Sequence, residues 1–489
     1  MDNTTENFQS TKDFKFSSVL LTPVDEDKPL DISGLVSKIN YVESIFMPFV
    51  SATMVVVDSG VNLLQTLPIQ GMEKVTFSVK TNMREEAFEY NFRIWKVANR
   101  YAQQNKQVYT LALVSEEAIL NECRRVNQRL QGNPESIIKK LLTEELYLSS
   151  TKPINSEGSL FEVSYLPTKE RPFDIIAKLI HKSVSPKAKF STDNTSEPTS
   201  VEVTSSPDQK AKKIRGSGGF FFWENYRGYN FFAVDSMCAD DESPLKSEKY
   251  NVQEWGPYVE RGVNVSDDGD NRFTIESSTF SSDLDLMNGL RRGQYGSRIV
   301  FFNHSTGQYD EYDYILEETY DNMAHLGGQK SLNKISYTQE SLSKKPSKLM
   351  SIVLDHETWY NEPGIANPED EKAENPTKFA DWQKYYAAQS TARYRLLQLQ
   401  QCLIVIPGNA EICAGDRIDI RLINKVSSVE LVEEESSQED KESSGLYLIA
   451  EATHTYDKTK STNGAFTTTL KLTRDSYGMK DEPSSHDNK

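Results

Sequence analysis

The sequence predicts a β-rich α+β protein in which two similar antiparallel β-barrels flank an α+β insertion. Three observations lead to this fold class. Apolar and polar residues alternate through the first hundred residues, the next segment has helical periodicity, and the C-terminal third repeats the pattern of the N-terminal third. With 489 residues, the chain is long enough for about three domains.

The first hundred residues predict an antiparallel meander. Strands are expected at about 75–79, 88–94 and 108–114, with a polar hairpin loop at 81–86 between the first two. Each strand has one apolar and one polar face, so one face is buried and the other is wet. The inward-facing residues are expected to be Val75, Phe77, Val79, Phe88, Tyr90, Phe92, Ile94, Tyr109, Leu111 and Leu113.

Helical signals follow the meander. Ser115 is a candidate N-cap for a helix reaching about residue 130, and Asn133-Pro134 opens a second helix through about residue 146. A third helix is predicted from Pro172 to about residue 182. Residues 183–215 are polar and poor in large apolar side chains, which predicts a flexible surface loop.

The middle of the chain mixes strands and helices. An aromatic hairpin is predicted at 218–235, with Gly228 suited to a turn that needs a positive φ. Further strands are expected near 273–280, 298–302 and 312–316. Helices are expected at 284–290 and from Asn375-Pro376 to about residue 388.

The C-terminal third repeats the order of strands and turns found in the N-terminal third. A general likeness between antiparallel meanders is the alternative, but order and spacing over four strands favour a repeat. The matched segments are 51–60 with 400–409, 71–79 with 414–422, and 92–118 with 447–476. The resulting domains are a first barrel at 1–114, the insertion at 115–265 and 319–395, a second barrel at 266–318 and 396–477, and a polar tail at 478–489.

Charge and cysteine content restrict the possible functions. The net charge of −17 disfavours a protein that grips nucleic acid, because such a surface repels phosphate. The four cysteines form no CxxC pair and are expected to be buried thiols in a reducing compartment. The N-terminal sequence lacks the basic and apolar segments of a signal peptide.

No motif points to catalysis, a metal or a cofactor. His356-Glu357 lacks the second histidine of a metalloprotease motif, and the acidic residues at 267–270 lack the spacing of a calcium loop. The glycine-rich segment 216–219 is not followed by the Lys-Ser/Thr of a phosphate-binding loop. We therefore expect no catalytic, metal-binding or cofactor-binding residues.

The aromatic hairpin contains a candidate interface. Its aromatic residues are denser than one hairpin can hide in its own core, so packing on the barrel and contact with another subunit are both open. The candidate interface residues are Phe220, Phe221, Phe222 and Trp223.

The C-terminal third resembles a known family. The segments 407–409, 414–418, 445–449 and 470–476 are similar, in this order, to the C-terminal signature of baseplate central hub proteins of contractile-tailed, T-even-like phages. These hubs are related to the hub part of type VI secretion spike proteins. The hairpin at 219–235 and the segment 286–314 also resemble the family. The barrel-fold signature residues are Pro407, Gly408, Asn409, Gly415, Asp416, Ile418, His454, Arg474 and Asp475.

The resemblance implies a non-enzymatic homotrimer with two tail-tube-like barrels in each subunit. Three chains would form a pseudo-sixfold ring that joins a sixfold tail tube, or its initiator, to a threefold spike protein. Baseplate wedge and tape-measure proteins are further partners, and DNA would contact the ring only in transit through a channel with negatively charged walls. The protein would belong to the virion tail baseplate and be assembled in the host cytoplasm.

Two other functions are possible, a peptidoglycan-cleaving tail enzyme and a tail adhesin. The polar loops 183–215 and 425–444 have no counterpart in the family pattern, so their role is open.

Overall fold

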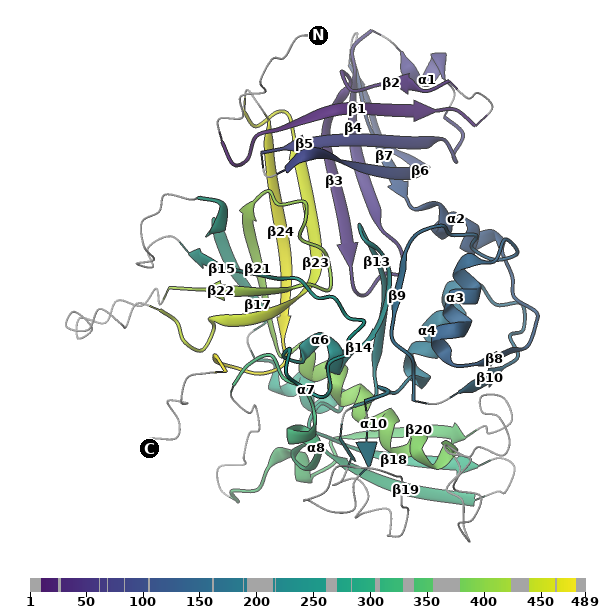
Figure 1. The fold of residues 1–489 in the computed structure, drawn as a ribbon, viewed down its shortest axis with the longest axis vertical. Coiled ribbons are helices and arrows are strands. Elements are labelled where there is room, and N and C mark those ends of the chain that lie inside the picture. Colours follow the sequence, from purple (N-terminus) through teal and green to yellow (C-terminus); the bar gives the residue numbers. More distant parts are fainter. Residues whose placement is uncertain are drawn as a thin grey trace, which may run out of the picture.

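The computed structural model (Figure 1) describes most of the chain. The described residues are 10–24, 28–60, 62–67, 69–82, 84–103, 106–160, 162–187, 189–190, 214–215, 217–260, 271–282, 284–303, 308–328, 338–354, 379–423, 439–461 and 464–480. Most of the loop predicted to be flexible at 183–215 lies outside these residues, as do most of 425–444 and the end of the polar tail.

The N-terminal strands form a first β unit, seen in purple at the top of Figure 1. Its pairing order is β3-β4-β7-β6-β5-β1-β2, and all pairs are antiparallel. Every residue predicted to face inward is buried, so the predicted meander is confirmed. The elements are β1 (Phe14–Thr22), β2 (Leu30–Asp31), β3 (Val36–Ser44), β4 (Ser51–Asp58), α1 (Leu63–Thr66), β5 (Lys74–Thr81), β6 (Arg84–Gln103) and β7 (Lys106–Val114).

The insertion begins with helices as predicted. In α3, the Asn133 side chain accepts a hydrogen bond from the Glu135 amide at 3.1 Å, and Pro134 occupies the first turn. Helix α2 is shorter than predicted because the chain extends to bridge Val126 to Glu170. The elements are α2 (Glu116–Cys123), β8 (Leu130–Gly132), α3 (Pro134–Thr143), β9 (Ile154–Ser156), β10 (Val163–Tyr165), α4 (Pro172–Lys182), β11 (Lys189–Phe190), β12 (Ile214–Arg215), β13 (Phe220–Asn225), β14 (Gly228–Ala233) and α6 (Val234–Cys238).

A separate three-stranded sheet lies at the bottom of Figure 1, next to α10. The strands β18 and β19 were assigned to the second barrel, but β18 pairs with β19 on one side and with β20 on the other. Ile299 and Tyr314 pack in one core with Ala388 and Ala392 of α10, which explains this grouping. The elements are α7 (Leu286–Arg292), β18 (Gly296–Asn303), β19 (Gln308–Ile315), α8 (Leu316–Thr319), β20 (Lys348–Leu354) and α10 (Phe379–Leu397).

The remaining strands form a second β unit. Its pairing order is β17-β21-β24-β23-β22-β15-β16, and β15, which was assigned to the insertion, runs parallel to β22. The unit comprises β15 (Glu254–Glu260), β16 (Thr274–Ile275), β17 (Ser277–Ser282), β21 (Gln400–Pro407), β22 (Arg417–Arg421), β23 (Gly445–Asp457) and β24 (Ala465–Arg474). Short 3-10 turns occur at Asn271–Phe273, Tyr320–Asn322 and Leu342–Lys344.

The pairing β23-β3 joins the two units into one branched 14-stranded sheet. The protein is therefore β-rich α+β, as predicted, but the described strands do not close into separate barrels. Three cysteines are buried free thiols, whereas Cys123 at the end of α2 is exposed, contrary to the expectation.

The internal repeat is confirmed by the strand order. The series β4-β7-β6-β5 in the first unit corresponds to β21-β24-β23-β22 in the second, and all pairs in both are antiparallel. The outer strands β3 and β17 pair with β4 and β21 in the same way. Only the match of 51–60 with 400–409 needs a shift of one residue, because Ala52 and Cys402 occupy equivalent places opposite Leu113 and Leu472.

Candidate functional site at the junction of the two β units

The same turn opens β5 and β22. Met72 in the first unit and Gly415 in the second have positive φ values of 75° and 96°. The Met72 amide donates to the Ile94 carbonyl at 2.8 Å, and the Gly415 amide donates to the Ile449 carbonyl at 2.9 Å. The repeat therefore extends to single hydrogen bonds.

An acidic residue follows each of these positions and holds its turn. Glu73 accepts hydrogen bonds from the amides of Gln70 and Gly71, the shortest at 2.7 Å. Asp416 accepts one from the Cys413 amide at 3.1 Å. Both carboxylates are buried. In each unit the acid replaces backbone partners that the turn lacks.

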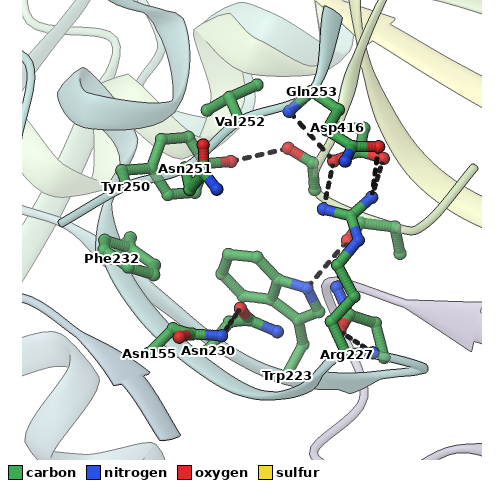
Figure 2. A pocket seen from close by; sticks show the side chains of 13 residues that line it. Asn155, Trp223, Arg227, Asn230, Phe232, Tyr250, Asn251, Val252, Gln253 and Asp416 are labelled. Carbon is green, nitrogen blue, oxygen red and sulfur yellow. Dashed lines mark hydrogen bonds and ion pairs between the residues drawn. The ribbon is translucent and has the colours of Figure 1, made fainter. Parts of the chain in front are cut away.

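Asp416 has further partners that Glu73 lacks, and Figure 2 shows two of them, Arg227 and Gln253. The Arg227 guanidinium donates to both carboxylate oxygens, through Nη1 at 3.0 Å and through Nη2. The Trp255 indole also donates to Asp416 at 3.0 Å, and the Gln253 amide does so at 3.4 Å. Asp416 thus ties the aromatic hairpin and the start of β15 to the second β unit.

The aromatic hairpin packs directly on this turn. The Trp223 indole donates to the Ala414 carbonyl at 2.9 Å, and the Tyr250 hydroxyl donates to the Gly415 carbonyl at 2.6 Å. A Cβ atom on Gly415 would lie 2.5 Å from the Trp223 ring, so only glycine fits there. These residues and several amide side chains line a small polar pocket of about 120 Å³ (Figure 2).

Glu43 of β3 joins three parts of the molecule. Its carboxylate accepts hydrogen bonds from the Tyr41 hydroxyl at 2.6 Å, the Tyr226 amide of the hairpin at 2.6 Å and the Ala414 amide at 2.8 Å. Burial raises the pKa of Glu43 to about 7 despite these donors. The two β units and the insertion therefore meet at one buried carboxyl group.

Arg474 and Asp475 of the signature anchor the end of β24. The Arg474 guanidinium lies over the Tyr447 ring and donates to Gln400 and to the Ser444 and Glu442 carbonyls. Both signature residues are fully buried, so they act within the chain.

Asp475 belongs to a buried ionic network. It pairs with Arg393 of α10 at 2.6 Å and with His325 at 2.9 Å, while Arg393 also lies 3.5 Å from Asp235. Burial alone would raise the pKa of Asp475, but the His325 and Arg393 charges outweigh it and hold that pKa well below its ordinary value. This network fixes α10 and α6 to the second β unit.

The remaining signature residues shape the loop between β21 and β22. A Cβ atom on Gly408 would overlap the Phe466 ring, and the Asn409 amide donates to the Thr468 hydroxyl at 3.0 Å. Pro407 ends β21, and Ile418 lies in the core of the second unit. His454 is bonded to Thr468 and to the Ile412 carbonyl, each at 3.1 Å, and burial lowers its pKa to about 4. The structure thus brings all the signature residues into the second unit and its junctions.

The candidate interface residues Phe220, Phe221, Phe222 and Trp223 are buried within the chain. Phe220 and Phe222 pack in the insertion core, and Phe221 and Trp223 pack in the core that joins the insertion to the second β unit. Packing inside the chain, one of the two interpretations from the sequence, accounts for their burial.

Glu43, Arg227 and Arg393 are the site residues that the sequence analysis missed. Glu43 had a weak signal, because it is a charged residue on the same face of the strand as the apolar residues Ile39 and Tyr41. Within the described residues, no group of His, Cys, Asp or Glu side chains is arranged to hold a metal ion. Nor does any described helix combine the length and apolarity needed to cross a membrane. The arrangement joins the two β units and the insertion through buried hydrogen bonds and ion pairs.

No protein-family profile and no curated sequence matches the chain. Among solved structures, it is similar to the tail protein from Neisseria meningitidis MC58, at 11% identity and a TM-score of 0.46 over 96% of this chain and 99% of that one. It is also similar to the 43 kDa tail protein of prophage MuSo2 from Shewanella oneidensis, at 8% identity and a TM-score of 0.46 over 94% and 98% of the two chains.

A third similar structure is a type VI secretion component of E. coli, described as similar in structure to T4 bacteriophage tail proteins. Its identity to this chain is 11% and its TM-score is 0.37, over 96% of this chain and 79% of that one.

Proposed function

We propose that this chain is the structural central hub of a contractile phage tail baseplate. In this proposal three chains form a ring of six similar β units around a channel. The ring joins a sixfold tail tube or its initiator to a threefold spike, and DNA passes through it without being gripped.

One observation carries the proposal: the two β units of one chain are already joined edge to edge. The strand β23 pairs with β3 over seven residues, from Glu451 opposite Ser44 to Asp457 opposite Lys38. The strand corresponding to β23 in the first unit is β6, and the strand corresponding to β3 in the second unit is β17. An equivalent joint would therefore be β6 with β17.

Both of these edges are free among the described strands. Past Arg93, β6 pairs only with β7, and β17 pairs only with β21. Trp95, Lys96 and Tyr101 along the β6 edge are exposed, as is Thr279 on β17. An unpaired edge is a template for a strand of another chain.

These edges lie on different units of the chain, so pairing between copies is head to tail and can close into a ring. Three chains with two units each supply six units, which matches a sixfold tube and a threefold spike at once. The excess of negative charge keeps a polyanion such as DNA from adhering to such a ring. Wedge and tape-measure proteins are the remaining partners that we propose.

The first test is the mass and shape of the purified protein. The proposal expects a trimer of about three times the 55.6 kDa chain mass and, in negative-stain images, a ring with a central hole. A chain that stays monomeric at micromolar concentration, alone and with the spike protein, contradicts the hub assignment.

A disulfide test addresses the proposed edge pairing. In the intact joint Thr455 lies opposite Asn40, and strand pairing makes Tyr101 and Thr279 their counterparts. The double variant Tyr101→Cys with Thr279→Cys, in a Cys123→Ser background, should form cross-linked dimers and trimers when oxidised, whereas each single variant should not. A trimer without these cross-links would exclude this edge pairing and leave the hub assignment in place.

The two alternative functions are tested with the same preparation. A peptidoglycan-cleaving enzyme would clear suspended cell walls, and an adhesin would bind intact host cells as the purified chain. The hub proposal expects neither result.

A further inference from the structure

A second pocket lies apart from the junction, between α7, the end of α10, β17 and the start of β21. Its volume is about 160 Å³. Arg292, Arg395, Gln294, Asn288, Gln398 and Gln401 are among the side chains that line it. The lining is therefore rich in hydrogen-bond donors.

Positive charge gathers at this pocket in a strongly acidic chain. Arg292 comes from the last turn of α7 and Arg395 from the last turn of α10. A third cation is close by, because the Lys348 ammonium donates to the Arg292 carbonyl at 3.4 Å. The acid in the lining is Asp285, one oxygen of which already accepts the Asn288 amide at 3.0 Å.

The cations lie close enough to disfavour one another. Burial and the neighbouring Arg292 charge lower the pKa of Arg395. Burial lowers the pKa of Lys348, and the charges of Arg395 and Arg292 lower it further. Within the described part of the chain, Arg292 forms no ion pair with a carboxylate. An anion at this place would relieve the repulsion.

Gln294 supplies a second, independent sign of a ligand. Its side chain lines the pocket but is only 4% exposed. Its Nε2 atom is buried and has no hydrogen-bond partner among the described residues. A buried donor without an acceptor is rare and costs stability. Because Gln294 lines the pocket, a turn of its side chain would bring this donor to an acceptor group placed there.

We propose that this pocket binds an oxyanion, a phosphate or carboxylate group, between Arg292, Arg395 and the Gln294 amide. A water molecule occupies about 30 Å³ in the liquid, so the pocket has room for one such group and a few waters. Planar guanidinium groups match both anions in shape and charge. This inference does not rest on the proposed function as a hub.

Calorimetric titration of the full-length chain tests the site. Inorganic phosphate and glutarate serve as separate probes at constant ionic strength, so that the stronger binder tells which kind of oxyanion the pocket prefers. Arg292→Gln should weaken binding by about tenfold or more, because a charged hydrogen bond is lost. Arg291→Gln is the matched control, since Arg291 is an exposed neighbour on the same helix and does not line the pocket.

Gln294→Met adds a readout that a surface effect would not give. It keeps the size of the side chain and removes the unpartnered amide, so it should weaken anion binding and raise the melting temperature of the ligand-free chain. Equal loss of binding in Arg292→Gln and Arg291→Gln would overturn the proposal. Absence of binding by both probes up to about 10 mM would also overturn it.

Discussion

The two β units share one backbone design but differ in what covers it. Each has a bulge directly after the residue whose carbonyl accepts the hydrogen bond of the turn amide. The bulge residue is Trp95, after Ile94, in β6 and Ala450, after Ile449, in β23. Trp95 is 57% exposed, whereas Ala450 is 1% exposed and packs in the core beneath the aromatic hairpin. The second unit is therefore fixed inside the chain, and the first presents the equivalent surface outward.

This difference teaches that sequence repeats need not preserve surfaces. The bulge residue is the small Ala450 where the insertion covers it, and the large aromatic Trp95 where the surface is exposed. The four predictions below separate what the two units share from what distinguishes them.

The largest expected effect concerns the shared core. Phe77 and Ile420 occupy equivalent buried places in β5 and β22. Phe77→Ala should reduce the free energy of unfolding by about 3–5 kcal/mol and Ile420→Ala by about 2–5 kcal/mol. Arg421→Ala, at the next position, should cost less than about 1 kcal/mol because its ion pairs with Asp419 and Glu439 are half-exposed. Urea unfolding measures all three. Equal losses from Ile420→Ala and Arg421→Ala would refute the register.

The next effect separates the two strand-opening acids. Asp416→Ala should cost about 3 kcal/mol, because it removes the charged partner of the Arg227 guanidinium and the acceptor of the Trp255 indole. Glu73→Ala removes only the acceptor for two turn amides and should cost about 1 kcal/mol. Thermal and urea unfolding of the two variants provide the comparison. Losses of the same size would show that the extra contacts of Asp416 add nothing.

A smaller effect comes from pH. Burial raises the pKa of both Glu43 and Glu157 to about 7, from about 4.5 in the unfolded chain. Between pH 4.5 and about 7 the native state keeps these two carboxyl groups protonated, whereas the unfolded chain has released the protons. Stability is therefore fully present below pH 4.5 and falls as the pH rises through 7.

Glu43→Gln should flatten this fall by on the order of 2 kcal/mol between pH 5 and 8, as measured by urea unfolding. Glu89→Gln, at an exposed position of β6, is the control and should leave the slope unchanged. A Glu43→Gln variant with the slope of the unchanged protein would contradict the role of burial.

The smallest effect tests the exposed bulge. Trp95→Ala should change the stability of the isolated chain by less than about 1 kcal/mol, since its side chain is mostly in water. In the proposed ring the same change should promote dissociation into single chains. Analytical ultracentrifugation of the two proteins over a dilution series measures this. Unchanged dissociation would place the Trp95 surface outside the contact between chains.

Alternation and turn chemistry made much of the first β unit predictable from the sequence. Phe88, Tyr90 and Phe92 alternate with polar residues in β6. In the insertion, Asn133 and Pro134 are the local signal that starts α3. The repeat was predictable because the second unit uses the same strand order. The predicted alignment of β4 with β21 was wrong by one residue, since a shift of one residue leaves a similar sequence pattern.

The parts that failed depend on contacts between distant segments. The strands β18 and β19 alternate like any hairpin, and only their parallel neighbour β20 and the helix α10 assign them to another sheet. Arg393 looks like an ordinary helical arginine in the sequence. It becomes a buried ionic centre because Asp235 and Asp475 arrive from two other elements.

The joint between β3 and β23 has a consequence for the order of synthesis. The core of the first β unit is completed by Ala410, Tyr456 and Phe466, which a ribosome adds 296 or more residues after the end of β7. Until those residues have been made, β3 lacks its partner and part of the core is open to water. A growing chain therefore cannot complete the core of its first unit. Copies on neighbouring ribosomes cannot associate through completed β units before each chain has paired its own β3 with its own β23.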